Sequence, residues 1–283
     1  MNRNLDRCQL IERSINTKFR KALWTPFIQA IREYELIEPN DKIAVCISGG
    51  KDSMLMAKLL QELQKHSDFP FELVYLVMDP GYAPVNRQKI EDNASLLRIP
   101  ITVFESDIFA AADSVQQNPC YLCARMRRGA LYAKAQELGC RKIALGHHFS
   151  DVIETTVMAM FYGAQLQAML PKLHSQNFPG MTLIRPMYAI HEEDILAWCR
   201  YNELSFIQCA CRLTERVHNS ADGVGGSKRQ EIKLLLRELR KTNPNIEKNI
   251  FRAIHSVSLD TFPAYKTEGE LHSFLERFRA MEE

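Results

Sequence analysis

The sequence predicts an α/β protein with a parallel sheet, because strand patterns and helix patterns alternate along most of the chain. Short apolar runs typical of buried strands lie at residues 42–47, 71–78, 101–105, 142–146 and 183–185. Amphipathic patterns of helical period lie at residues 53–65, 84–97, 122–138, 151–162 and 191–202. Parallel strands need helices on both faces of their sheet, and this order of elements supplies them.

The segments on either side of this alternating region differ from it. Residues 6–36 place apolar side chains from Ile11 to Ile31 at near-helical spacing, so we expect one or two helices there. Beyond Cys211 the pattern becomes helical and basic. We therefore expect three parts: an N-terminal helical segment (1–38), an α/β domain that carries the clustered cysteines (39–211) and a basic helical C-terminal region (212–283).

Composition and charge limit the class of protein. The chain has 283 residues, 46% of them hydrophobic, which is enough for a full core. The net charge of +2 does not by itself indicate a nucleic-acid partner, but residues 1–25 carry six basic against two acidic side chains, and residues 212–252 carry ten against five. No apolar run reaches the roughly 18 residues that span a bilayer, and the first residues lack the apolar core of a secretion signal. We expect a cytoplasmic protein.

The turn at residues 48–50 is the first candidate site. An apolar strand ends at Ser48-Gly49-Gly50, and a helix begins at once, so bare backbone N–H groups lie where α/β sheets bind ligands. Ser53 can add a hydroxyl donor and Lys51 a positive charge, so an anion fits there. The nucleotide loop of P-loop NTPases is excluded, because it needs Gly and Ser or Thr at positions that hold Val45 and Asp52 here.

The string SGGKDS, residues 48–53, resembles the pyrophosphate-binding motif of PP-loop ATPases (adenine nucleotide alpha hydrolase-like), which cleave ATP between its α and β phosphates and adenylate a substrate oxygen. The resemblance implies that this motif holds the leaving pyrophosphate. It also implies Mg²⁺, for which Asp52 and Asp151 are candidate ligands, since hard carboxylate oxygens suit that ion. Lys51, Asp52 and Asp151 are thus candidate catalytic residues. Asp79, at the end of the second strand, lies where such enzymes receive the adenosine.

The eight cysteines divide into two kinds. Disulfides are rare in the cytosol, so closely spaced cysteines need a metal or catalytic explanation. We expect the isolated ones to be small buried residues: Cys8, Cys46, Cys140 and Cys199. The pairs are Cys120 with Cys123, at a helix start that favours thiolates, and Cys209 with Cys211.

The first pair, C-x-x-C, is compatible with a redox dithiol, half of a zinc site or part of an iron–sulfur site. A structural zinc site usually needs four ligands from two such pairs, whereas the second pair is C-x-C. Three thiolates and one open position fit a [4Fe–4S] cluster better.

A longer resemblance narrows the function. The strings NPCYLCARMRRG, KIALGHHFSDVIETTVMAMFYG and LIRP, with the late cysteines, are similar to the tRNA 2-thiocytidine synthetase family, the tRNA-cytidine(32) 2-sulfurtransferases of TtcA type, from about residue 16 to about residue 255. The resemblance implies Cys120, Cys123 and Cys209 as cluster ligands. Two departures stand out: Ser150-Asp151 replaces the family's Asp-Asp, and the late pair is C-x-C instead of C-x-x-C, so Cys211 is the alternative to Cys209.

The expected reaction is therefore thiolation of a tRNA cytidine, with ATP, Mg²⁺ and the cluster as cofactors and a sulfur donor such as a cysteine desulfurase. Arg125 and Arg128 share one helix face that could grip a tRNA phosphate. His147 and His148 could hold phosphate or base, or form a structural pair, and the N-terminal helices could serve a homodimer. Two alternatives stay open: a PP-loop sulfurtransferase that uses persulfides or another substrate, and a zinc-stabilised RNA-binding protein with a vestigial loop.

Overall fold

The computed structural model describes the backbone of residues 5–106, 108, 119–207 and 228–280, and the side chains of all these residues except 119–124. Its contacts divide the chain into two units, Met1–Ser227 and Lys228–Glu283, and each unit is described by itself. The three-part division expected from the sequence stays a prediction.

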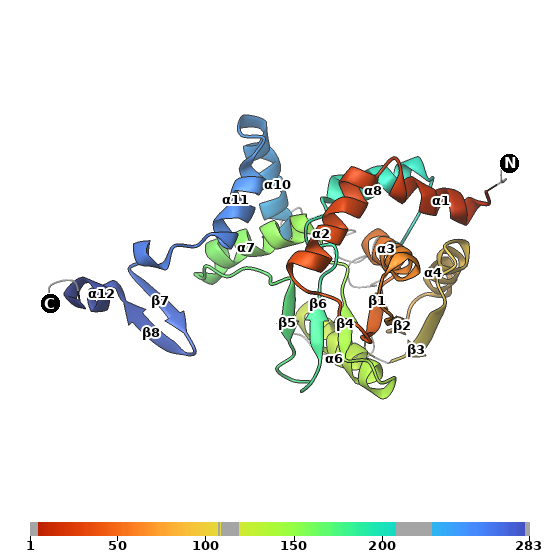
Figure 1. Ribbon diagram of the computed structural model, residues 1–283, viewed down its shortest axis with the longest axis horizontal. Helices are drawn as coiled ribbons and strands as arrows, with labels where there is room; N and C mark the ends of the chain where they lie inside the picture. Colours follow the sequence, from red (N-terminus) through yellow and green to blue (C-terminus); the bar gives the residue numbers. More distant parts are fainter. Residues whose placement is uncertain (1–4, 107, 109–118, 208–227, 281–283) are drawn as a thin grey trace. The chain divides into compact units, whose positions relative to one another are not determined.

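The first unit is built on a six-stranded sheet (Figure 1). Its strands are β1 (Lys42–Ile47), β2 (Glu72–Asp79), β3 (Ile101–Glu105), β4 (Lys142–Ala144), β5 (Lys172–His174) and β6 (Thr182–Ile184). The order is β3-β2-β1-β4-β6-β5, and all neighbours are parallel except β5 and β6. The predicted parallel sheet is confirmed. Because the strand order reverses between β1 and β4, the crevice beyond their carboxyl ends is the expected place for a ligand.

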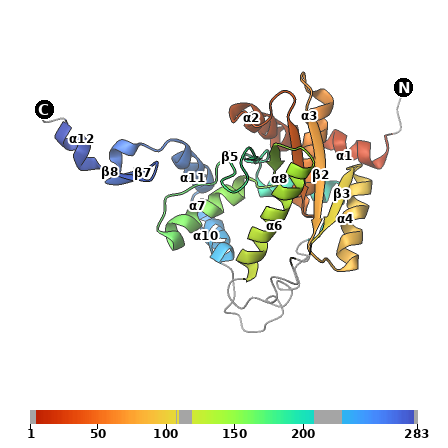
Figure 2. The same cartoon turned by 90° about the horizontal axis from the view of Figure 1, so that it is seen from below.

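Helices cover both faces of this sheet. They are α1 (Arg7–Asn16), the π-helical turn η1 (Arg20–Trp24), α2 (Thr25–Glu33), α3 (Lys51–His66), α4 (Pro84–Leu96), α6 (Pro119–Glu137), α7 (Phe149–Gly163) and α8 (Glu192–Tyr201). The larger core cluster joins one face of the sheet to α1–α4 and α8 and contains the fully buried Trp198. A second cluster packs α6 on the other face through Tyr132 and Ala135, and Figure 2 gives a second view of this layer.

Some elements differ from the sequence pattern for local reasons. Helix α7 begins two residues before the predicted start, because the backbone N–H of His148 donates to the Asp151 carboxylate at 2.9 Å and caps the first turn. Strand β4 ends at Ala144, before the predicted end at residue 146, and the chain turns away through Leu145 and Gly146. The edge strand β5 was not predicted, since three residues are too few to show a period.

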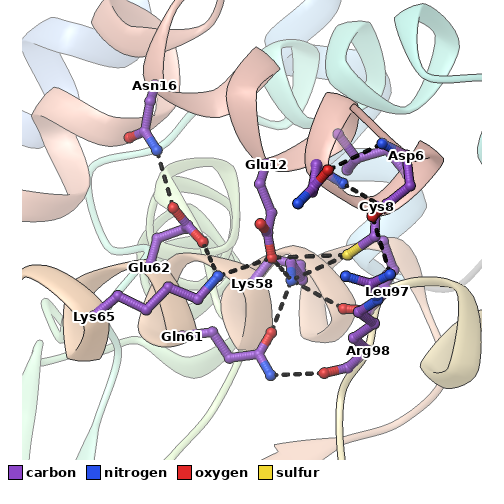
Figure 3. A network of polar contacts seen from close by, with 12 residues as sticks. Asp6, Cys8, Glu12, Asn16, Lys58, Gln61, Glu62, Lys65, Leu97 and Arg98 are labelled. Atoms are coloured by element: carbon purple, nitrogen blue, oxygen red, sulfur yellow. Dashed lines mark hydrogen bonds and ion pairs between the residues drawn. The ribbon is translucent and has the colours of Figure 1, made fainter. Parts of the chain in front are cut away.

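A polar network fastens α1 to α3 (Figure 3). The Lys58 side chain is 1% exposed, and its ammonium lies 2.6 Å from Glu12 Oε1 and 2.9 Å from the carbonyl oxygen of Leu97. Glu12 also accepts from Lys65 at 3.0 Å. Although burial acts against the carboxylate, these two ammonium groups lower the pKa of Glu12 below its ordinary value. The N-terminal segment is therefore fixed to the helix that carries the SGGKDS motif.

The second unit contains α10 (Lys228–Thr242), α11 (Ile246–His255), a 3₁₀ turn (Leu259–Thr261), the hairpin β7 (Ala264–Thr267) and β8 (Glu270–Ser273), and α12 (Phe274–Ala280). Arg240 pairs with Glu247 at 2.5 Å and links α10 to α11. The C-terminal region is thus helical only in part, because it also contains this hairpin. The hairpin was not expected from the sequence. Nowhere in the described parts of the chain is a helix both long and apolar enough to cross a membrane.

Candidate active site

A cavity of about 320 Å³ lies beyond the carboxyl ends of β1 and β4, where the strand order reverses. Four residues predicted from the sequence line it: Ser48, Asp52, Ser53 and Asp151. His147, Gly146 and Leu145 close the side that follows β4, and Met78 and Leu131 add apolar surface. The structure therefore brings the glycine turn and the start of α7 to one site, although about 100 residues separate them.

Hydrogen bonds fix the glycine turn in shape. The Ser48 N–H donates to Ser53 Oγ at 3.2 Å, and Ser53 Oγ donates to the carbonyl oxygen of Gly50 at 3.0 Å. Gly49 has φ +84°, and a Cβ atom there would lie 2.5 Å from Ile90 and 2.8 Å from Ile207. Only glycine suits this position, because other residues rarely adopt that φ and the neighbouring side chains leave no space. Helix α3 then begins at Lys51 and presents its first N–H groups at the cavity.

Gly146 allows the segment after β4 to approach this turn closely. A Cβ atom at Gly146 would lie 3.2 Å from the Asp52 carbonyl carbon and the Ser53 nitrogen, which are backbone atoms of the first turn of α3. A side chain would therefore push the N–H groups of α3 away from their present positions. Only a weak sign of this role is present in the sequence, where Gly146 stands at the end of a predicted strand.

We expect Gly146→Ala to weaken binding of magnesium-ATP roughly tenfold, because a displacement of a few tenths of an ångström misaligns several phosphate contacts together. Isothermal titration calorimetry measures the affinity. Gly129→Ala in α6 is the matched control, since a Cβ atom there meets no described atom within 4 Å outside its own stretch of helix. That control should keep the affinity of the wild type. Equal affinities for the two variants would show that the close approach at Gly146 has no role in phosphate binding.

Charged side chains form a row beside the cavity. The Lys51 ammonium lies 3.1 Å from Asp52 Oδ1 and 3.2 Å from Glu192 Oε1 at the start of α8. Burial acts against the ammonium, but the two carboxylates outweigh it and raise the pKa of Lys51 above its ordinary value. The His148 imidazole lies beside two carboxylates of the site, with Nε2 3.8 Å from Asp52 Oδ1 and Nδ1 3.4 Å from Asp151 Oδ2.

Asp52 and Asp151 are the carboxylates predicted to bind Mg²⁺, and both line the cavity. Among the described residues, no three His, Cys, Asp or Glu side chains are grouped as a metal site. Mg²⁺ usually takes one or two carboxylates and completes its shell with phosphate oxygens and water, so two carboxylates beside a phosphate site suit it. The role of Asp52 and Asp151 as magnesium ligands stays a prediction.

Asp79 lies at the end of β2, next to β1 in the sheet, and organises the turn that follows it. Its carboxylate accepts from the N–H groups of Gly81 (2.9 Å) and Tyr82 (2.7 Å) and pairs with Arg87 at 2.7 Å. Partial burial raises the pKa of Asp79, but these hydrogen bonds and the ion pair lower it by more, so the net shift is downward. Its predicted role in receiving adenosine stays a prediction.

Arg127 lines the cavity, whereas Arg125 and Arg128 are exposed. The Arg127 guanidinium donates to the Tyr82 hydroxyl at 3.3 Å and so joins α6 to the turn after β2. Sequence reasoning singled out Arg125 and Arg128 and missed Arg127, because a helical pattern does not reveal which face meets a cavity. It also missed Glu192, for which the sequence carries no signal.

The structure describes the side chains of the four isolated cysteines. Cys8, Cys46, Cys140 and Cys199 are buried, as predicted, and burial raises the pKa of all four thiols. Cys120 and Cys123 lie in the first turns of α6, and positions three apart in a helix share one side. Cys209 and Cys211 lie outside the described residues, so the choice between them stays open.

Comparisons with known proteins agree with this architecture. Residues 16–216 match the family model of the PP-loop domain. The fold resembles the solved structure of the U34-tRNA thiolase NcsA from Methanococcus maripaludis with its [4Fe–4S] cluster, with a TM-score of 0.63 and 22% identity over 88% of this chain and 82% of that one. The sheet, the glycine turn and the matched model together define a PP-loop protein, which confirms the resemblance of the SGGKDS motif.

Sequence relatives narrow this class further. The chain is 34% identical over 262 residues to a tRNA-cytidine(32) 2-sulfurtransferase of Neisseria meningitidis, across 92% of this chain and 78% of the relative. It is 35% identical over 249 residues to the tRNA-cytidine(32) 2-sulfurtransferase of Alkalilimnicola ehrlichii, across 87% of this chain and 75% of the relative. The chain belongs to the tRNA-cytidine(32) 2-sulfurtransferase family.

Proposed function

We propose that this protein is an ATP-dependent sulfurtransferase that replaces the C2 oxygen of cytidine 32 in tRNA with sulfur. The observation that carries the proposal is the glycine turn at Ser48–Ser53, which opens into a cavity that also holds Asp52 and Asp151. Hydrogen-bond donors for phosphate and carboxylates suited to Mg²⁺ thus meet at one place, as cleavage of ATP between its α and β phosphates requires. The names of the sequence relatives support the tRNA cytidine as substrate.

The residues of the chain take separate roles in this reaction. The N–H groups at the start of α3, with the Ser48 and Ser53 hydroxyls, hold the pyrophosphate, and Lys51 neutralises its charge. Asp52 and Asp151 hold Mg²⁺ against the phosphates. Asp79 and the turn that it organises receive the adenosine. The C2 oxygen of cytidine then attacks the α phosphate and pyrophosphate leaves. A sulfide-level sulfur nucleophile from the donor then attacks C2, and the C2–O bond breaks as AMP leaves with its oxygen.

The two closely spaced cysteine pairs fit a [4Fe–4S] cluster. Cys120 and Cys123, three positions apart in α6, supply two of its ligands, and Cys209 or Cys211 supplies the third. The four buried cysteines belong to the hydrophobic interior and are not needed for this set. When bound, a cluster with three cysteine ligands would supply an open iron that can carry sulfur. The cluster in the thiolase from Methanococcus maripaludis supports this assignment.

Transfer RNA has two basic areas to contact. Arg125 and Arg128 are exposed on α6, close in sequence to the cluster cysteines. Helices α10 and α11 carry basic side chains in the second unit. A sulfur donor such as a cysteine desulfurase is required by the atom balance of the reaction. A homodimer through the N-terminal helices stays a prediction.

Anaerobic reconstitution of the full chain with iron and sulfide tests the proposal, followed by incubation with ATP, Mg²⁺, a sulfur source and unmodified tRNA. We expect about four irons per chain, release of AMP and a thiolated cytidine at position 32. AMP release without iron uptake would keep the adenylating enzyme and assign the cysteines to persulfide chemistry. Bound zinc with neither iron nor AMP release would favour the RNA-binding protein.

A further inference from the structure

Lys51 carries the only basic side chain of the SGGKDS motif, and the structure ties it to a residue of another helix. Its ammonium lies 3.2 Å from Glu192, the first residue of α8, and 3.1 Å from Asp52. The Lys51 and Glu192 side chains are 24% and 20% exposed, so solvent screens this ion pair less than a pair on the open surface. Two carboxylates therefore share one ammonium that the phosphate also requires.

Glu192 is held in place by its surroundings. The N–H of Phe149, the first residue of α7, donates to the carbonyl oxygen of Ile190 at 2.9 Å, and the Phe149 ring lies 4.1 Å from the His191 ring. Ile195 and Trp198 of α8 are fully buried and anchor the helix in the core. The helix that carries Glu192 is thus fixed in place, whereas the long flexible stem of Lys51 can move its ammonium from one anion to another.

We propose that Glu192 is a positioning residue that competes with pyrophosphate for the Lys51 ammonium. Asp52 lines the cavity, whereas the Lys51 ammonium lies between Asp52 and Glu192. Binding of phosphate exchanges the Glu192 carboxylate for a phosphate oxygen, and departure of pyrophosphate returns the ammonium to Glu192. Glu192 therefore limits the affinity for the leaving group and assists its release. This inference rests on the proposed phosphate site at residues 48–53.

Titration of the full chain with magnesium pyrophosphate tests the competition. Glu192→Gln should lower the Kd roughly three- to tenfold, because the competing charge is gone while the side-chain shape is kept. Glu192→Asp keeps the charge but withdraws it by one methylene, so its Kd should lie between those of the wild type and Glu192→Gln. A merely structural carboxylate at the helix start would make Glu192→Asp bind like the wild type.

Glu193→Gln is the matched control, because Glu193 is the next residue of α8, is exposed and loses the same charge. Its Kd should change by less than about twofold, since an exposed charge is screened by solvent. Equal effects of Glu192→Gln and Glu193→Gln would reduce the result to a general charge effect and overturn the competition. An unchanged or higher Kd for Glu192→Gln, with normal binding by the wild type, would also overturn it. No binding by the wild type would instead overturn the proposed phosphate site, and this inference with it.

Discussion

Cys120→Ala is expected to abolish thiolation of tRNA and to leave the binding of ATP unchanged. Loss of a cluster ligand should lower the thiolation rate by at least about 100-fold. Substitution of residues that only hydrogen-bond to a metal ligand already lowers metal affinity or activity by about 10- to 100-fold. The glycine turn and α3 are separate elements from α6, which carries Cys120. Thiolated cytidine measured by nucleoside mass spectrometry gives the activity, and calorimetry with ATP gives the affinity.

Cys140→Ala is the matched control for this prediction. Cys140 is buried in the second core cluster, where its thiol acts as a small apolar group. This variant should keep both thiolation and the iron content of the wild type. Thiolation by Cys120→Ala at the rate of Cys140→Ala would remove Cys120 from the sulfur chemistry, whatever the iron content.

Lys58→Met is expected to lower the free energy of unfolding of the first unit by about 3 kcal/mol, because it removes one partner of a buried ion pair. The side chain is 1% exposed, and its loss deprives Glu12 and the Leu97 carbonyl of a donor. Urea unfolding followed by tryptophan fluorescence measures the effect. The probe is specific, since Trp24 and Trp198 are the two tryptophans of the chain and both pack in the larger core cluster.

Lys65→Met removes the other ammonium that contacts Glu12, but its side chain is 50% exposed. Exposed ion pairs contribute little, so this control should cost less than about 1 kcal/mol. A double variant of Lys58→Met with Glu12→Gln should recover part of the lost free energy of unfolding. The reason is that Glu12→Gln removes the carboxylate that Lys58→Met leaves without its buried ammonium. Equal losses for Lys58→Met and Lys65→Met would refute the view that the buried pair fastens α1 to α3.

Local sequence determined much of the fold. The apolar runs and helical periods predicted the five parallel strands and most helices, because each pattern lies within a short window and reflects burial on one or both faces. The glycine turn at residues 48–50 was equally local, since its conformation depends on residues that follow one another. The burial of the four isolated cysteines was predicted from their apolar surroundings and confirmed.

Tertiary structure alone decided which distant groups meet. Nothing in the sequence pairs Lys51 with Glu192, sets Gly146 against the start of α3 or buries Lys58 under α1. The patterns fix the spacing along each element but not the way in which two elements are turned toward each other. Those contacts depend on how helices rotate and pack against the sheet, and a small rotation changes which side chain reaches the site. The sequence therefore identified the glycine turn, whereas packing decided the neighbours of the lysine that follows it.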